Sequence, residues 1–167
     1  MAEKNNTSPL APLSFLIGQW EAQSSPGEPT GGFTFAPDLL GQVMLRTNYA
    51  DYPAAPDHPA FRHEDLMVLY MDGAQTLRAD YYDSEGHVIR YTGEISGTGQ
   101  VAFTSEPTPD GPGFRLAYRS DADGMLTGTF EIALPQQSGK YAPYLSWTAR
   151  KLEVDKHEST SFDGGRS

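Results

Sequence analysis

Residues Met71–Gln100 read MDGAQTLRADYYDSEGHVIRYTGEISGTGQ and set the pattern of the fold. Two runs within this stretch, Thr76–Asp83 and His87–Ile95, alternate between apolar and polar residues. Each run is bounded by tight turns that contain glycine. A period of two is typical of β-strands, and short glycine-bearing turns join antiparallel neighbours. The stretch therefore predicts two antiparallel strands of a meander.

The same alternation continues on both sides of this stretch, again separated by turns such as Asp121–Gly124. No helical pattern lies between the runs, which argues against a parallel βαβ sheet. A meander of about eight to ten strands usually closes on itself, because closure removes exposed edges. We therefore expect an all-β, antiparallel up-and-down β-barrel of the lipocalin-like kind. The expected strands are Gln19–Ser24, Gly31–Ala36, Gln42–Ala50, His63–Met71, Thr76–Asp83, His87–Ile95, Gln100–Ser105, Phe114–Ser120, Leu126–Leu134 and Lys140–Leu152.

The chain is expected to form one domain. Apolar residues at helical spacing in Pro9–Ile17 predict a short helical turn before the first strand. The barrel is expected over residues 10–152, between a flexible N-terminus (1–9) and a flexible C-terminal tail (153–167). The proline-rich stretch Asp51–Arg62 is the one long connection, and it is either a lid at the barrel mouth or a solvated insertion.

Composition limits the classes of function. The 167 residues include 12 Lys and Arg against 22 Asp and Glu, and the net charge of -10 argues against nucleic acid and anionic membranes as partners. The absence of cysteine excludes disulfides, thiol catalysis and thiolate metal sites. Pro9 and Pro12 interrupt the best apolar stretch of the N-terminus, which makes it a poor secretory signal. We expect a cytoplasmic monomer or homodimer that binds a small molecule.

The two ends of the barrel sequence carry residues suited to closing it. Gly18 and Trp20 open the first strand, and Arg150 lies near the end of the last. Because closure makes these strands neighbours, we expect Arg150 to stack on the Trp20 indole at the closed end of the barrel.

These residues resemble the lipocalin and fatty-acid-binding superfamily, and more closely a bacterial lipocalin-like (calycin-type) family of unknown function. The resemblance implies a barrel with a cavity, suited to an apolar ligand. The matching segments are Phe15–Glu21 (FLIGQWE), Tyr82–Gly86 (YDSEG), Arg90–Gly93 (RYTG), Phe114–Tyr118 (FRLAY) and Trp147–Lys151 (WTARK).

A more distant resemblance is to the haem-binding nitrobindin-like barrels, which implies haem as a cofactor. Those barrels open with G-x-W-x-G-x-G, whereas Ala22 and Ser24 stand at the later glycine positions here. The proximal histidine needed near the last strand is not evident, because His157 falls beyond that strand. We therefore expect no cofactor.

Aromatic side chains supply the candidate ligand-binding residues. They either fill the barrel, as in many small barrels, or form a wall for a flat apolar ligand. The candidates are Tyr81, Tyr91, Phe114, Tyr118, Phe130 and Trp147.

Polar residues supply candidate catalytic groups. Arg78, Asp80 and Tyr82 share one strand face, with Arg90 across the hairpin. If this face points outward, they form surface ion pairs that contribute little to stability. If it points inward, they could orient a carboxylate or act as acid and base. The catalytic candidates of an enzyme would be Arg78, Asp80, Tyr82, Arg90 and Glu131.

Histidines with neighbouring carboxylates raise the question of a metal site. His63 and Asp65 fall on one face of a strand, as two metal ligands require, and His58 and Glu64 lie close in sequence. Such groups beside a loop are usually solvated, so we expect no metal site. His87 is placed at a barrel rim, exposed or as a general base.

These observations favour a module that binds a small apolar or aromatic molecule in a barrel cavity. The alternatives are an isomerase, cyclase or hydrolase that acts on a small metabolite in the cavity, and an interaction protein that uses the outer wall.

Overall fold

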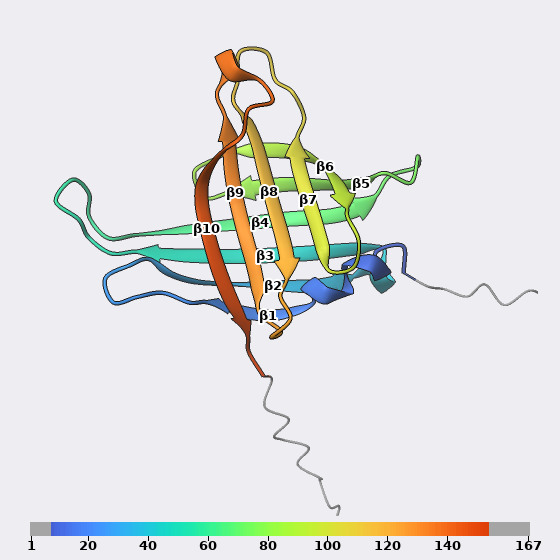
Figure 1. Cartoon of the computed structure of the whole chain (residues 1–167), viewed down its shortest axis with the longest axis horizontal. Coiled ribbons are helices and arrows are strands. Elements are labelled where there is room, and N and C mark those ends of the chain that lie inside the picture. Colours follow the sequence, from blue (N-terminus) through green and yellow to red (C-terminus); the bar gives the residue numbers. More distant parts are fainter. Residues whose placement is uncertain (1–7, 154–167) are drawn as a thin grey trace, which may run out of the picture.

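The computed structural model describes residues 8–153, which form a closed antiparallel barrel of ten strands (Figure 1). Each strand pairs with its neighbours in sequence, and β1 pairs with β10 to close the barrel. The predicted up-and-down barrel is therefore confirmed. The strands are β1 (Gly18–Ala22), β2 (Thr30–Asp38), β3 (Val43–Tyr52), β4 (Phe61–Met71), β5 (Leu77–Asp83), β6 (Val88–Ile95), β7 (Gln100–Ser105), β8 (Gly113–Ser120), β9 (Leu126–Ala133) and β10 (Ala142–Lys151).

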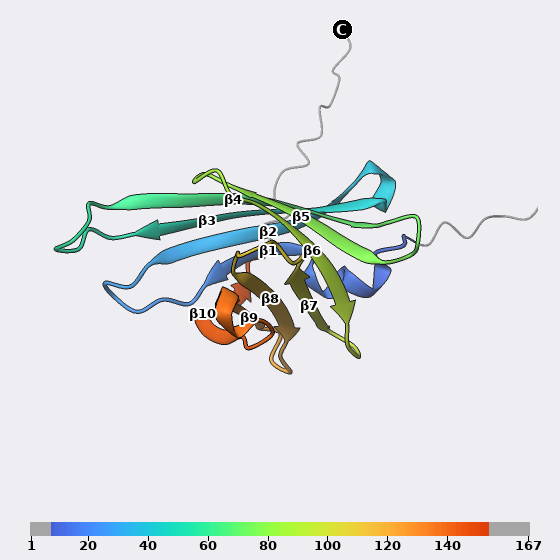
Figure 2. The same cartoon turned by 90° about the horizontal axis from the view of Figure 1, so that it is seen from above.

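The barrel is flattened into two layers. Strands β2–β5 run side by side, and β7–β10 cross them steeply (Figure 1). Seen from above, the two groups lie in separate layers, with β6 at the turn between them (Figure 2). A space between the layers can therefore have walls of different chemistry.

One end of the barrel is closed by a short 3-10 helix, η1 (Ala11–Leu16), which lies where a helical turn is predicted. Its side chains Leu13 and Leu16 are fully buried in the core. The Trp20 Nε1–H donates to the Leu16 carbonyl oxygen at 2.8 Å, which ties the helix to β1. Burial of this apolar helix face closes the end of the barrel where β1 begins.

The cation over the Trp20 indole is Lys151 and not Arg150. Trp20 is buried as predicted, and Lys151 Nζ lies 5.5 Å from its ring centroid. The β1–β10 register sets Trp20 opposite Lys151 and Glu21 opposite Arg150. Directly opposed residues share a face, so Arg150 points outward, where its Nη2–H donates to Glu21 Oε2 at 2.6 Å. The predicted stacking of Arg150 is wrong by one position of the register.

The connection between β3 and β4 is shorter than the sequence suggests. Both strands continue into the stretch expected to be a loop, which leaves residues 53–60 between them. Arg62 binds both Asp51 carboxylate oxygens at 2.7 Å, and the Tyr52 and Phe61 rings stack with centroids 4.7 Å apart. These cross-strand pairs extend the ladder toward the prolines.

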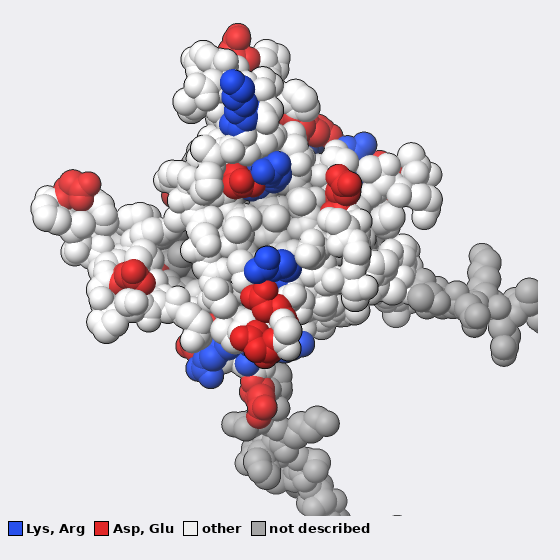
Figure 3. Space-filling view, viewed as in Figure 1, with Lys and Arg blue, Asp and Glu red and all other residues white. Residues whose placement is uncertain are grey.

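The outer surface mixes charges of both signs. On the face shown in Figure 3, basic and acidic groups are interspersed over the strands. No helix between residues 8 and 153 is long and apolar enough to span a membrane. The predicted flexible ends fall mainly on residues 1–7 and 154–167, outside the described residues.

Candidate functional site

A cavity of about 1380 Å³ lies between the two layers of the barrel. Its lining includes residues of the β1–β2, β5–β6 and β7–β8 connections, which share one end of an up-and-down barrel. That end is opposite η1, so the cavity has a mouth at one end and a closed core at the other. The cavity exceeds the roughly 300–1,000 Å³ usual for small-molecule sites.

One wall of the cavity is aromatic. The Phe114 and Phe130 rings of β8 and β9 stack with centroids 5.8 Å apart, and Trp147 of β10 continues the wall. Gly128 lies directly opposite Trp147, and a Cβ there would overlap the indole. The glycine therefore lets the tryptophan lie against β9.

The structure brings most of the predicted ligand-binding residues to one cavity. Tyr118 is buried in the core and is not among the lining residues. The five that line the cavity are Tyr81, Tyr91, Phe114, Phe130 and Trp147.

The opposite wall carries a buried ion pair. Arg46 of β3 and Asp65 of β4 are cross-strand neighbours that both point inward, and Arg46 Nη1 lies 2.5 Å from Asp65 Oδ1. Their side chains are only 5% and 4% exposed. Asn48 Nδ2–H donates to the other Asp65 oxygen at 2.8 Å. A charged pair this deep is held by good geometry and further hydrogen bonds.

Arg46 lies in an aromatic environment. Its Cζ is 6.0 Å from the Phe33 ring centroid and 5.9 Å from that of Tyr118. Burial opposes its charge, but the electrostatic effects of Tyr118 and Asp65 raise the pKa of Arg46 above its ordinary value. Burial also raises the pKa of Tyr118 to about 12, and it raises that of Tyr91. These tyrosines are therefore neutral beside a permanent cation.

Two buried polar atoms lack a hydrogen-bond partner within residues 8–153. They are Arg46 Nε and the Tyr118 hydroxyl oxygen. A buried polar group without a partner usually costs about 1–3 kcal/mol, so natural proteins rarely retain one without reason. The two residues are neighbours, with Arg46 Cζ 5.9 Å from the Tyr118 ring centroid.

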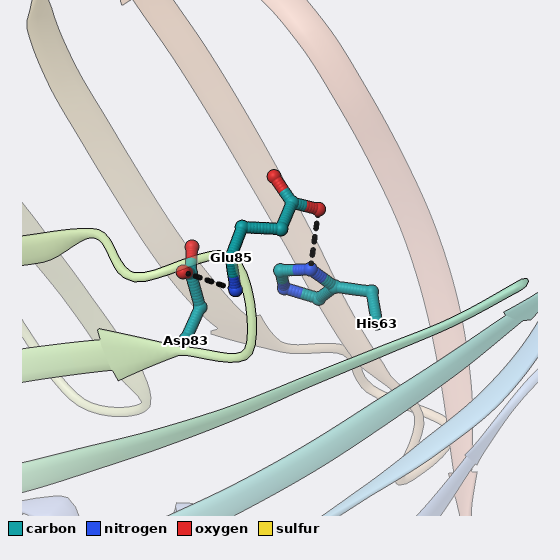
Figure 4. A group of neighbouring side chains, drawn as sticks. All are labelled: His63, Asp83 and Glu85. Carbon is teal, nitrogen blue, oxygen red and sulfur yellow. Dashed lines mark hydrogen bonds and ion pairs between the residues drawn. The ribbon is translucent and has the colours of Figure 1, made fainter.

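Titratable groups gather at the rim of the cavity. His63 Nδ1 lies 3.2 Å from Glu85 Oε1 (Figure 4). The Tyr81 hydroxyl lies 3.3 Å from His63 Nε2. The same hydroxyl donates to Asp83 Oδ2 at 3.3 Å, and His87 Nδ1 lies 2.9 Å from that oxygen. Burial is the largest influence on Tyr81 and raises the pKa of its hydroxyl.

The predicted catalytic group does not assemble inside the barrel. Arg78 Nε–H donates to Asp72 at 3.0 Å, Tyr70 donates to Asp80 at 3.4 Å, and Arg115 donates to Glu131 at 2.6 Å. These are outward-facing pairs on alternate strand positions, as one of the two interpretations of the sequence expects. Of the five candidates, only the exposed Arg90 is among the lining residues, whereas Arg78, Asp80, Tyr82 and Glu131 are not.

Sequence reasoning missed Arg46, Asn48 and Asp83 as site residues. The first two follow Met44 at alternate positions of β3, so a period of two places all three on one face. A cation and an amide on the buried face of a strand are the signal that could have found them. Asp83 ends β5 beside a turn whose sequence resembles many exposed turns, so it gave no such signal.

That the chain binds no haem stays a prediction. A proximal histidine from the last strand is what the nitrobindin-like resemblance requires, and Ala142–Lys151 contains none. The histidines that line the cavity, His63 and His87, lie at the rim between β4 and β6 instead.

Comparison with solved structures relates this barrel to the crystal structure of Rv2717c from M. tuberculosis. The TM-score is 0.58 at 15% sequence identity, over 88% of this chain and 99% of that chain. Searches with protein-family models and among curated proteins found no match. At this identity the likeness shows the barrel fold alone, and the lipocalin-like family stays a prediction.

Proposed function

We propose that this barrel binds a small amphiphilic molecule in its cavity. The observation that carries the proposal is a large space with two unlike walls, one aromatic and one holding the buried Arg46–Asp65 pair. A barrel interior with a purely structural role is filled by side chains, whereas this one leaves about 1380 Å³.

The two walls define the class of ligand. Phe114, Phe130 and Trp147 offer a flat apolar surface, which suits an aromatic or aliphatic body. Arg46 and Asn48 offer hydrogen-bond donors, which suit an oxygen-bearing or anionic group. A few polar groups in an apolar site usually fix the orientation of a ligand, so the oxygen-bearing end is expected against β3.

The test uses one of the protein's own tryptophans as a reporter. The chain has two tryptophans, and Trp20→Phe leaves Trp147 in the cavity as the single one. This variant is titrated with 1-anilinonaphthalene-8-sulfonate, which combines an aromatic body with an anionic group. We expect saturable binding of one probe, with quenching of the Trp147 emission by energy transfer.

Matched variants separate the cavity from the outer wall. Ala50 lines the cavity, whereas Ala117 lies on β8 between the inward-facing Leu116 and Tyr118 and so points outward. Ala50→Phe is expected to weaken probe binding by more than about tenfold because it fills the space, and Ala117→Phe to leave it unchanged. Equal binding by both variants, or no saturable binding, would contradict the proposal.

The enzymatic alternative has lost its original support. Its candidates Arg78, Asp80, Tyr82 and Glu131 belong to the outer wall, away from any molecule in the cavity. Binding is therefore the one function proposed.

A further inference from the structure

Three side chains with metal-binding atoms converge at the rim of the cavity. His63 points inward from β4, Asp83 ends β5, and Glu85 lies in the β5–β6 turn (Figure 4). One ligand atom from each lies within 4.8 Å of the others. The His63 and Asp83 side chains are mostly buried, at 20% and 5% exposure, and Glu85 closes the group from the solvent side.

The backbone holds this group in place. Asp83 Oδ1 accepts the N–H groups of Glu85 at 3.0 Å and of His87 at 2.9 Å. The Ser84 N–H donates to the Glu64 carbonyl oxygen of β4 at 2.8 Å. The turn that carries Glu85 is thereby fixed both to Asp83 and to the strand that carries His63.

Neighbouring groups orient two of the three side chains, those of His63 and Asp83. The Tyr81 hydroxyl lies 3.3 Å from His63 Nε2 and from Asp83 Oδ2, and His87 Nδ1 lies 2.9 Å from the same Asp83 oxygen. Histidines and carboxylates that bind metals usually have such outer partners, which fix the ring and the carboxylate in position.

We propose that His63, Asp83 and Glu85 bind a divalent transition-metal ion of the zinc class. A set of one imidazole and two carboxylates matches zinc and its neighbours, whereas magnesium and calcium prefer oxygen alone and soft ions need thiolates. The two carboxylates also balance the charge of a divalent ion. Metal binding to these residues requires no molecule in the cavity, so this proposal is independent of the proposed function.

The spacing of His63 and Glu85 suits such an ion. In a tetrahedral zinc site with bonds of 2.0–2.1 Å, two ligands lie about 3.4 Å apart. His63 Nδ1 and Glu85 Oε1 are already 3.2 Å apart, so an ion would replace their present hydrogen bond. Three protein ligands leave one coordination position open, and all three residues line the cavity.

The experiment titrates the full chain, first treated with EDTA and dialysed. Cobalt(II) serves as a probe through its visible absorption, and zinc affinity is measured by calorimetry and by displacement of cobalt. We expect one ion per chain. His63→Gln and Glu85→Gln are each expected to weaken binding by more than about tenfold, since loss even of an outer partner often costs 10–100-fold.

His58→Gln is the matched control. His58 lies outside the group but also has a carboxylate nearby, with its Nε2 3.8 Å from Asp57. Unchanged binding in this variant, with thermal melts showing that all variants fold, supports the assignment. Saturable binding lost equally in His58→Gln and His63→Gln, binding unaffected by His63→Gln, or no binding of either ion would overturn it. The titration of Trp20→Phe with 1-anilinonaphthalene-8-sulfonate, carried out in EDTA, tests the cavity separately. Failure of one proposal therefore leaves the other standing.

Discussion

Arg46 is the residue whose environment differs most from that of an ordinary arginine. Its side chain is 5% exposed, pairs with Asp65 inside the barrel, and lies beside two aromatic rings. Removing one member of a buried pair leaves the other charge without compensation, which is why such pairs are costly to break singly.

We expect Arg46→Met to lower the free energy of unfolding by about 3–5 kcal/mol, because Asp65 stays buried without its cation. The double variant Arg46→Met/Asp65→Leu should lose less than the sum of the single variants, since no charge remains unpaired. Urea denaturation of the three proteins measures the coupling. Strictly additive losses would mean that the two side chains do not interact.

Trp20 and Lys151 test the closure of the barrel. Trp20→Ala should cost about 3–5 kcal/mol, as for other buried aromatic residues. Lys151→Met should cost about 0.5–1 kcal/mol through the lost cation–π contact. Arg150→Met should cost less than about 1 kcal/mol, because its pair with Glu21 is half exposed. In double-mutant cycles measured by denaturant melts, Trp20 should couple to Lys151, and coupling to Arg150 instead would contradict the register.

The same pair shows how far sequence reasoning reaches for single residues. Alternation predicts which residues share a face of one strand, and it correctly separates Asp80 from Tyr81. It does not fix the register of two strands that are distant in sequence. A cation at position 150 or at position 151 fits the alternation equally well. Only the β1–β10 register decides between them.

Turns are the elements on which the sequence was most informative, and Asp72 shows why. Its Oδ1 accepts the Ala74 and Thr76 N–H groups at 2.9 and 3.0 Å, and its Oδ2 accepts from Arg78 at 3.0 Å. The Thr76 backbone bond and the Arg78 bond hold the pKa of Asp72 below its usual value. Strand boundaries set by such turns were predicted to within about two residues.

The pH dependence of the turn follows from that pKa. A depressed pKa in the folded state means that the carboxylate stabilises the fold above its unfolded pKa of about 3.9. The contribution is lost as pH falls through the lower folded pKa. We expect Asp72→Asn to reduce the denaturant midpoint near pH 7, and the difference from the natural protein to shrink toward about pH 3. A difference that stays constant across this range would contradict a stabilising role of the ionised Asp72 carboxylate.

The short 3-10 element η2 (Leu39–Gly41) carries backbone strain. Leu40 has φ 58 and ψ 33, the left-handed region, and its side chain is 92% exposed. A left-handed conformation costs an ordinary residue about 1–2 kcal/mol, and asparagine tolerates it better. Leu40→Asn should therefore raise the melting temperature. Leu134→Asn is the control, because Leu134 is also exposed but has φ -67, and it should bring no gain.

At the scale of the whole molecule, the closing seam is the shortest pairing in the barrel. The β1–β10 register covers only Trp20–Ala22, whereas β3 pairs with β4 from Val43 through Tyr52. Local opening begins where few bonds must break. The amides that join β1 to β10 should therefore exchange hydrogen faster than those between β3 and β4, as measured by NMR. Equal protection of both pairings would mean that the barrel opens only by global unfolding.

Alternation and turn chemistry are local, so they predict the barrel, whereas the cavity is expected only from the resemblance to lipocalin-like barrels. Whether Phe114 and Phe130 fill the interior or line a space depends on how the two layers cross, and no local pattern records that crossing. The titratable residues at the cavity rim could not be predicted for the same reason. His63 contacts Glu85 only because β4 and β5 pair.

The closure of one barrel end by η1 and Trp20 has a consequence for how any ligand enters and leaves the cavity. A cavity that is closed at one end has a single mouth. The part of a ligand that enters first must therefore leave last. The trailing part stays near the solvent, where a bulky attachment does not disturb the fit, whereas the same attachment on the leading part blocks entry. For a ligand of the proposed kind, the single mouth means that the leading part lies toward η1 and the trailing part lies near the solvent.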